Sequence, residues 1–104
     1  MTKMLMELIK LDLNTPSFQH DFFGLQSEEQ VALLKTLKKI SQMTWVQLYQ
    51  DKGLHWEAIL SKQGHQGQRL YSLRFSKKYR ATAMRQDAFL RLLTLHTDHD
   101  SAYR

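Results

Sequence analysis

The segment LRFSKKYRA groups basic side chains that could bind a phosphate. Its four cations are Arg74, Lys77, Lys78 and Arg80. On a regular strand Arg74, Lys78 and Arg80 would share one face, because successive side chains point to opposite sides. A row of guanidinium and ammonium groups can clamp a phosphate and stabilise charge that develops on it. The alternative is that these cations form only the solvated outer face of a sheet.

Such a row suits phosphoryl transfer in RNA. That reaction needs an activated 2′-hydroxyl, cationic stabilisation of the phosphate and a proton donor for the leaving 5′-oxygen. The tail HTDHDSAYR supplies His99 and Tyr103 as candidates for proton transfer, since histidine titrates near neutral pH. Tyr103 also has a structural alternative, in which its ring packs on the sheet.

The same tail carries potential metal ligands, namely His96, Asp98, His99 and Asp100. Their spacing matches no known zinc pattern, and the end of a strand would splay the two histidines apart. We therefore expect no metal and no cofactor at this tail.

The basic surplus of the chain lies in one stretch. The 104 residues carry a net charge of +5. Between Arg69 and Arg91 there are seven basic residues against Asp87 alone, so the rest of the chain is slightly acidic. A local positive field attracts polyanions, which favours nucleic acid or an acidic protein as the partner. Lys77 and Arg85 of this stretch are further candidates for phosphate binding.

The segment GLHWEAIL holds a third group of polar residues. Trp56 is expected in the core or as a cover for the sheet. Glu57 should lie exposed or paired with a strand arginine, and His55 shares its face. A general base would have to lie near the scissile phosphate, whereas an ion pair has no such requirement, so we favour the ion pair.

Apolar periodicity and turn residues predict the elements that must position these side chains. Helices are predicted over 16–23, 28–42 and 45–51, and strands over 6–13, 54–60, 71–76 and 88–96. The segment 79–85 either extends the strand over 71–76 or forms the next strand. Capping-box patterns at Ser27-Glu-Glu-Gln30 and Thr44-x-x-Gln47 mark two helix starts, and Thr15-Pro16 marks another. The apolar stripe predicted for the second helix is formed by Val31, Leu34, Leu37 and Ile40.

This order predicts an α+β fold in which helices pack on one face of a twisted antiparallel sheet of four to five strands. One domain over 1–104 is expected from the length. The absence of cysteine excludes disulfides, thiolate zinc sites and a cysteine nucleophile. No apolar run is long enough to span a membrane, and the first residues do not have the pattern of a signal peptide, so a cytoplasmic protein is expected.

The ordered segments resemble the RelE/ParE superfamily of type II toxins over nearly the whole chain. The segments that carry the resemblance are TPSFQHDFFGL, a capped helix, GLHWEAI, LYSLRFSKKYRATA and FLRLLTLHTDHDSAYR. The resemblance implies a small α+β domain with a helical pair against the sheet. It further implies a RelE-type toxin that enters the ribosomal A site, cuts mRNA without a metal and inhibits translation.

The resemblance also implies roles for individual residues. Arg80 corresponds to the strand arginine that contacts the scissile phosphate, and Arg74 and Lys78 to its basic support. His99 stands where relatives place a basic or imidazole side chain, and Tyr103 corresponds to the C-terminal tyrosine. An acidic cognate antitoxin would cover this surface. Two alternatives remain open, namely a ParE-like inhibitor of DNA gyrase and an inactive basic binding module of the same fold.

Overall fold

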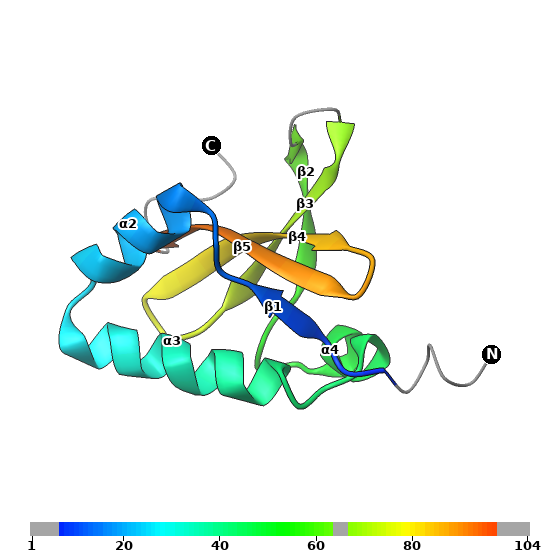
Figure 1. Cartoon of the computed structure of the whole chain (residues 1–104), viewed down its shortest axis with the longest axis horizontal. Helices are drawn as coiled ribbons and strands as arrows, with labels where there is room; N and C mark the ends of the chain where they lie inside the picture. The colour runs from blue at the N-terminus through cyan, green and yellow to red at the C-terminus, as the bar shows by residue number, and fades with distance from the viewer. Residues whose placement is uncertain (1–6, 64–66, 98–104) are drawn as a thin grey trace.

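The protein is described here by a computed structural model that covers residues 7–63 and 67–97, with the backbone alone for 61–63 (Figure 1). The elements in chain order are β1 (Lys10–Asp12), α2 (Pro16–Gly24), α3 (Ser27–Ile40), α4 (Trp45–Gln50), β2 (Glu57–Gln63), β3 (Arg69–Arg74), β4 (Tyr79–Gln86) and β5 (Phe89–Thr97). None of these helices is long and apolar enough to cross a membrane.

The five strands form one mixed sheet in the order β1-β5-β4-β3-β2. The predicted α+β fold is confirmed, with α2 and α3 packed on the same face of the sheet (Figure 1). Strands β2 to β5 are antiparallel, whereas β1 pairs in parallel with β5, so a wholly antiparallel sheet was the wrong expectation for this edge. Three helices and three strands separate β1 from β5, which gives the chain the long connection that parallel pairing requires.

The core lies between the helices and one side of the sheet, here called the helix face. It includes Leu33, Leu37 and Ile40 of α3 against Leu73 and Leu92 of the strands. The predicted stripe was partly wrong, because Val31 and Leu34 are 49% and 53% exposed. A helix turns every 3.6 residues, so the buried stripe follows spacings of four and three rather than a strict three.

The helix starts test the predicted caps. Thr44 forms the full capping box, because its backbone N–H donates to Gln47 Oε1 at 2.9 Å and its Oγ1 accepts from the Gln47 N–H at 3.2 Å. The box at Ser27 is absent, since the helix already begins there and Gln30 Nε2 donates to the Phe22 carbonyl instead. Thr15 precedes Pro16 as predicted, although its side chain makes no capping bond.

A β-bulge in β5 decides which side chains leave the core. Ala83 pairs with Leu92 and Thr82 with Thr94, so Leu93 is an extra residue. Helix α2 satisfies the backbone around this bulge, because Ser17 Oγ donates to the Leu93 carbonyl at 2.7 Å and Asp21 Oδ2 accepts from the Leu95 N–H at 3.0 Å. The bulge shifts the alternation of the strand by one residue.

Candidate phosphate-binding face

Three side chains line up across β3, β4 and β5 on the face opposite the helix face, here called the helix-free face. Arg74 pairs directly with Arg80, and Arg80 pairs directly with His96. Directly paired residues of antiparallel strands point to the same side, so these three side chains form one row, here called the Arg–His row. Across β3 and β4 the row brings together two cations that both belong to the predicted phosphate site.

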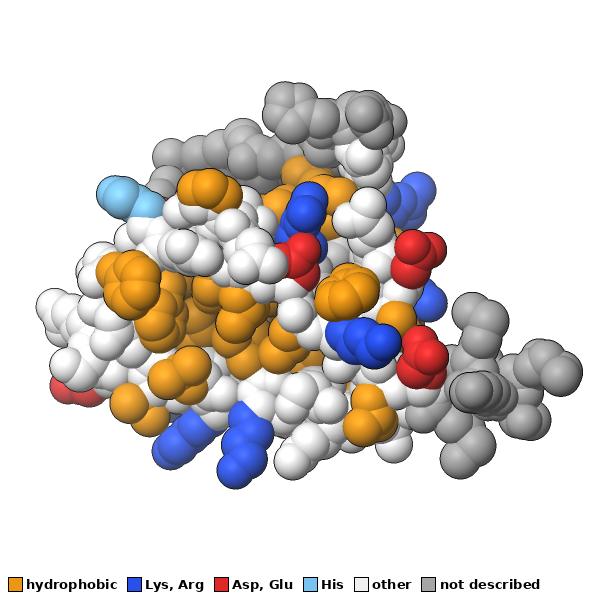
Figure 2. Space-filling view, viewed as in Figure 1, with side chains coloured by type: hydrophobic (Ala, Val, Ile, Leu, Met, Phe, Trp, Pro, Cys, Tyr) orange, Lys and Arg blue, Asp and Glu red, His pale blue; other side chains and the backbone are white. Residues whose placement is uncertain are grey.

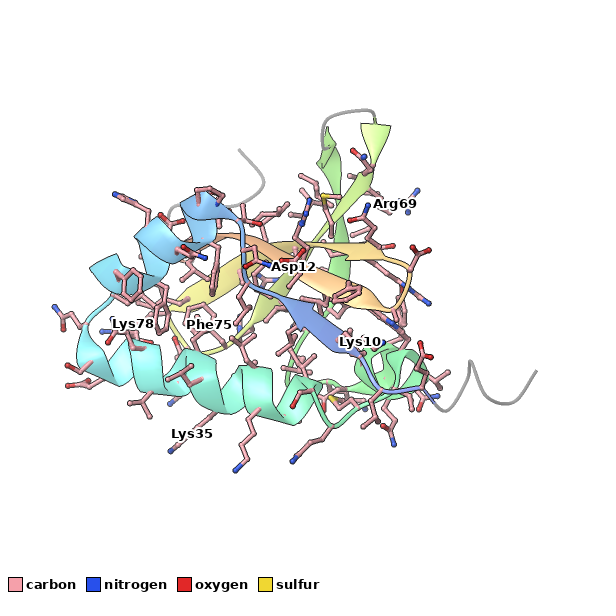
Figure 3. All side chains as sticks on the ribbon, in the orientation of Figure 1. Lys10, Asp12, Lys35, Arg69, Phe75 and Lys78 are labelled. Atoms are coloured by element: carbon pink, nitrogen blue, oxygen red, sulfur yellow. The ribbon has the colours of Figure 1, made fainter. Side chains whose placement is uncertain are left out.

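The pairing of two strands, not alternation along one strand, creates this row. Strand β3 ends at Arg74, and the four residues that follow form a turn. The Ser76 hydroxyl holds the turn by accepting the backbone N–H groups of Lys78 and Tyr79 at 3.3 and 3.1 Å. Phe75 lies between the sheet and the helices, and Lys78 lies at the same end of the molecule (Figure 3). Lys77 and Lys78 are therefore exposed turn residues beside the row, and the predicted single-strand row was wrong.

Arg80 is held in place by neighbours on β2 and β3. Its side chain is only 11% exposed, and its Nη2 donates to Ser72 Oγ at 2.6 Å. The same nitrogen lies 3.4 Å from Glu57 Oε1, which confirms the predicted ion pair of Glu57 with a strand arginine. Its Nε is buried and has no hydrogen-bond partner among the described residues. A buried donor without a partner lowers the stability of the fold by roughly 1–3 kcal/mol. The packing of Arg80 against its neighbours gives no reason for this cost.

His55 lies at the outer edge of this cluster. Its Nε2 is 3.6 Å from Glu57 Oε2, and its backbone has a φ of 53°. A left-handed backbone costs a non-glycine residue about 1–2 kcal/mol, so the local fold imposes the position of His55. Glu57 is 44% exposed, so its ion pairs with His55 and Arg80 are partly screened by solvent.

The imidazole of His96 is fixed by two hydroxyl groups. Its Nε2 lies 2.6 Å from Thr94 Oγ1 and 3.1 Å from Thr82 Oγ1. Thr82 pairs with Thr94 on one side and with Ser72 on the other, so three hydroxyls form a second row beside the Arg–His row. In a given tautomer this nitrogen carries either one proton or one lone pair, so it either donates to or accepts from these hydroxyls. His96 is thus the imidazole that the structure places next to Arg80.

Beyond the hydroxyl row the same face turns apolar. Ile59, Leu70 and Met84 are buried there, and Leu93 from the bulge packs against them. The bulge therefore contributes twice to this face, since it adds Leu93 to the apolar cluster and directs Thr94 and His96 away from the helices. The polar row thus borders an apolar cluster on this face.

The other candidate residues lie apart from this row. Arg85 is on the helix face, where its Cζ lies 4.2 Å from the centre of the Trp45 ring, so the structure does not bring it together with Arg80. His99 and Tyr103 lie outside the described residues, as do Asp98 and Asp100. Within the described part of the chain, no three His, Asp or Glu side chains are grouped so that they could hold a metal.

Sequence reasoning weighed His96 only as a metal ligand and assigned proton transfer to His99. The signal that identifies His96 is the doublet Leu92-Leu93, which breaks the alternation of β5. A doublet of large apolar residues within a strand indicates a bulge, after which the polar residues change face.

Comparisons with known proteins give a likeness of fold. No known protein-family profile and no curated protein matches the sequence. The structure is similar to the crystal structure of a copper-bound mutant toxin from Helicobacter pylori, with a TM-score of 0.51 and 21% sequence identity. The match covers 88% of this chain and 97% of that chain. The structural neighbour is a toxin. At this identity the likeness establishes the shared fold of the two chains.

Proposed function

We propose that this chain is the toxin of a type II toxin–antitoxin pair and acts as a ribosome-dependent mRNA endonuclease. The observation that carries the proposal is the direct pairing of Arg74 with Arg80 beside His96. Like charges directly opposite each other destabilise a sheet, so this pair does not serve folding. A phosphate bound between the two cations would relieve their repulsion. The toxin of similar fold supports the general role.

The proposed reaction is transesterification within the RNA. A base takes the proton of the 2′-hydroxyl, the 2′-oxygen attacks the adjacent phosphorus, and the bond to the 5′-oxygen breaks. The leaving 5′-oxygen takes up a proton, so the products are a 2′,3′-cyclic phosphate and a 5′-hydroxyl. The two proton transfers and the charge on the phosphate are the demands on the protein.

The Arg–His row meets these demands as follows. Arg74 is exposed and makes the first contact with the phosphate, while Arg80, held by Ser72 and Glu57, stabilises the charge of the transition state. His96 is the described imidazole that pairs directly with Arg80, so it is the one proposed to move a proton. His99 and Tyr103 keep the roles that the resemblance implies for proton transfer. The chemistry as written requires no metal ion.

The proposed setting on the ribosome agrees with the distribution of charge. Lys77 and Lys78 lie on the exposed turn next to the Arg–His row, where they would meet further phosphates of mRNA or ribosomal RNA. These contacts are electrostatic and independent of sequence, so they would position the enzyme rather than select a codon.

The proposed antitoxin is an acidic protein that covers the basic surface, and the helices offer it a second, apolar surface. A groove of about 350 Å³ between α2 and α3 is lined by apolar side chains that include Phe23 and Leu34, which are 74% and 53% exposed. Hydrophobic side chains gather on this part of the molecule, with basic side chains of α3 below them (Figure 2). Lys35 and Lys38 are exposed on α3, the helix that also carries Leu34 of the groove, and would pair with acidic residues of an amphipathic antitoxin segment.

Expression in growing cells tests the proposal. Induction of the wild-type chain should arrest growth, and primer extension on a reporter mRNA should show cuts that disappear when translation initiation is blocked. Arg80→Ala should abolish the cuts, and His96→Gln should reduce them about 100-fold or more. The matched control is Lys52→Ala, which removes an exposed cation far from the row in sequence. Arrest with intact mRNA and DNA damage would indicate a gyrase inhibitor instead.

A further inference from the structure

A second polar site lies on the helix face, where α4 meets β3 and β4. It is a hollow of about 700 Å³ whose lining includes Trp45, Tyr49, Tyr71, Arg69 and Arg85, here called the aromatic hollow. Its size lies in the range of small-molecule sites. Arg69 is the first residue of β3 and pairs with Gln63 at the loop end of the β2–β3 hairpin, and Lys78 lies on the other side of the molecule (Figure 3). We propose that the aromatic hollow binds one nucleotide of single-stranded RNA, apart from the Arg–His row.

The aromatic side chains of the hollow are packed into a rigid wall. Trp56 is 9% exposed and stacks on Tyr71 with ring centres 4.5 Å apart and planes at 12°. Trp45 and Tyr49 both meet the Trp56 ring, at 6.0 and 6.3 Å. Tyr49 remains 49% exposed. A rigid wall with one accessible ring provides a stacking platform for a base, which contributes about 1–3 kcal/mol in single-strand binding.

Arg85 is positioned by Trp45 and Tyr49 so that it could bind an anion at this wall. Its Cζ lies 4.2 Å from the centre of the Trp45 ring and 6.0 Å from that of Tyr49, and its Nη1 donates to the Tyr49 hydroxyl at 3.4 Å. A guanidinium that stacks on an aromatic ring contacts it through the flat face of the guanidinium. The N–H donors in the plane of the guanidinium therefore remain available to a ligand. Arg69 is exposed on the rim of the same hollow and adds a second guanidinium.

The phenol of Tyr49 reflects the nearby guanidinium. Burial alone would raise the pKa of Tyr49, but Arg85, whose Nη1 donates to the Tyr49 hydroxyl, helps to lower it below the ordinary value. Burial raises the pKa of Tyr71. The Tyr49 oxygen thus accepts from the same guanidinium that would bind the phosphate of a ligand.

The rim of the hollow favours a nucleotide over an acidic peptide. The side chains of Glu7 and Asp87 also line it, so two carboxylates stand near two arginines. Carboxylates repel a polyacidic segment, whereas they accept the N–H groups of a base, and guanine offers two such groups on one edge. A nucleotide supplies both the anion for the arginines and the donors for the carboxylates.

Intrinsic fluorescence tests this site directly, because the chain has two tryptophans. Trp45 lines the hollow and Trp56 stacks on Tyr71 of its wall. Titration of the purified chain with guanosine 5′-monophosphate should change the fluorescence saturably, and a short single-stranded RNA should bind more tightly. Inorganic phosphate should have a smaller effect, and a polyglutamate peptide should not compete.

Two substitutions of Arg85 make the test specific. Arg85→Ala should weaken nucleotide binding roughly tenfold or more, the range for a lost charge-assisted hydrogen bond. Arg85→Lys keeps the charge and should weaken binding similarly, because lysine does not replace a stacked fork of donors. Lys52→Ala is the control, and circular dichroism verifies that each variant is folded. The proposed site would be overturned by the absence of a fluorescence response, by Arg85 variants that bind as tightly as the wild type, or by competition from polyglutamate.

The role of this nucleotide in mRNA binding rests on the proposed function, whereas the binding itself does not. If the chain cleaves mRNA but its fluorescence does not change with nucleotides, the proposed nucleotide site is wrong and the proposed nuclease activity stands. If it binds nucleotides saturably but cleaves no mRNA, the nucleotide site stands and the nuclease activity is wrong.

Discussion

Arg74 and Arg80 pair directly across β3 and β4, so two cations occupy opposite positions of neighbouring strands. Pairs of like charge in this position cost roughly 0.2–1 kcal/mol in antiparallel sheets. Arg74→Thr should therefore raise the free energy of unfolding by a few tenths of a kcal/mol, while it weakens RNA binding. Thermal unfolding and filter binding measure the two effects on the same samples.

The same pair predicts a response to anions. Phosphate should raise the melting temperature of the wild type more than that of Arg74→Thr, because only the wild type offers two cations to one anion. Equal stabilisation of both proteins, or a loss of stability in Arg74→Thr with unchanged binding, would show that the pair is structural.

Glu57 competes with a phosphate for Arg80, since the two side chains lie 3.4 Å apart. Glu57→Gln should therefore tighten RNA binding a few-fold at low salt, and it should cost at most about 1 kcal/mol of stability, since the pair is partly solvated. Glu28→Gln, which removes an exposed carboxylate at the start of α3, is the control. Weaker RNA binding in Glu57→Gln would mean that the carboxylate positions Arg80 for the substrate.

Substitution by alanine should affect stability differently at the two capping motifs of the sequence. Thr44→Ala removes the bond from the Gln47 N–H to Thr44 Oγ1, while the backbone N–H of residue 44 can still donate to Gln47 Oε1, and it should lower the free energy of unfolding by about 1 kcal/mol. Ser27→Ala should have little effect, because Ser27 is already inside α3 and makes no capping bond. Urea unfolding of the two variants checks this, and equal losses would contradict the observed start of α3.

Acid should destabilise the fold through two aspartates. The Asn14 backbone N–H and then Arg91 lower the pKa of Asp12, while Lys39 and then the Leu54 N–H lower that of Asp51. A carboxyl group whose pKa is lower in the folded state adds stability above its ordinary pKa of about 4. That stability is lost as the pH falls from about 4 through the lower folded value. Urea unfolding against pH should show this loss, and Asp51→Asn should make it smaller.

Periodicity and turn residues predicted most of the fold because these are local signals. Pro16, Thr44 and the polar turns place the helices and strands within a few residues of their observed ends. The parallel edge formed by β1 depends on where the chain returns after three helices, and no local pattern encodes that. The exposure of Val31 and Leu34 likewise depends on which side of α3 meets the sheet.

The candidate site was predicted in part for the same reason. Arg74 and Arg80 were identified from the basic stretch of the sequence, but their pairing comes from the turn between β3 and β4, which the assumption of one regular strand had missed. His96 reaches the row only because Leu93 shifts the alternation of β5. Arg85 belongs to the same basic stretch and points to the other face, since charge content carries no information about the side of a sheet.

The chemical ends of the cut mRNA test the central claim most directly. Purified chain added to ribosomes that carry a defined mRNA should yield an upstream fragment ending in a 2′,3′-cyclic phosphate and a downstream fragment beginning with a 5′-hydroxyl. Arg80→Ala should yield neither fragment, and Lys52→Ala should yield both. Intact mRNA with the wild-type chain, or a downstream fragment with a 5′-phosphate, would contradict the attack by the 2′-hydroxyl at the Arg–His row.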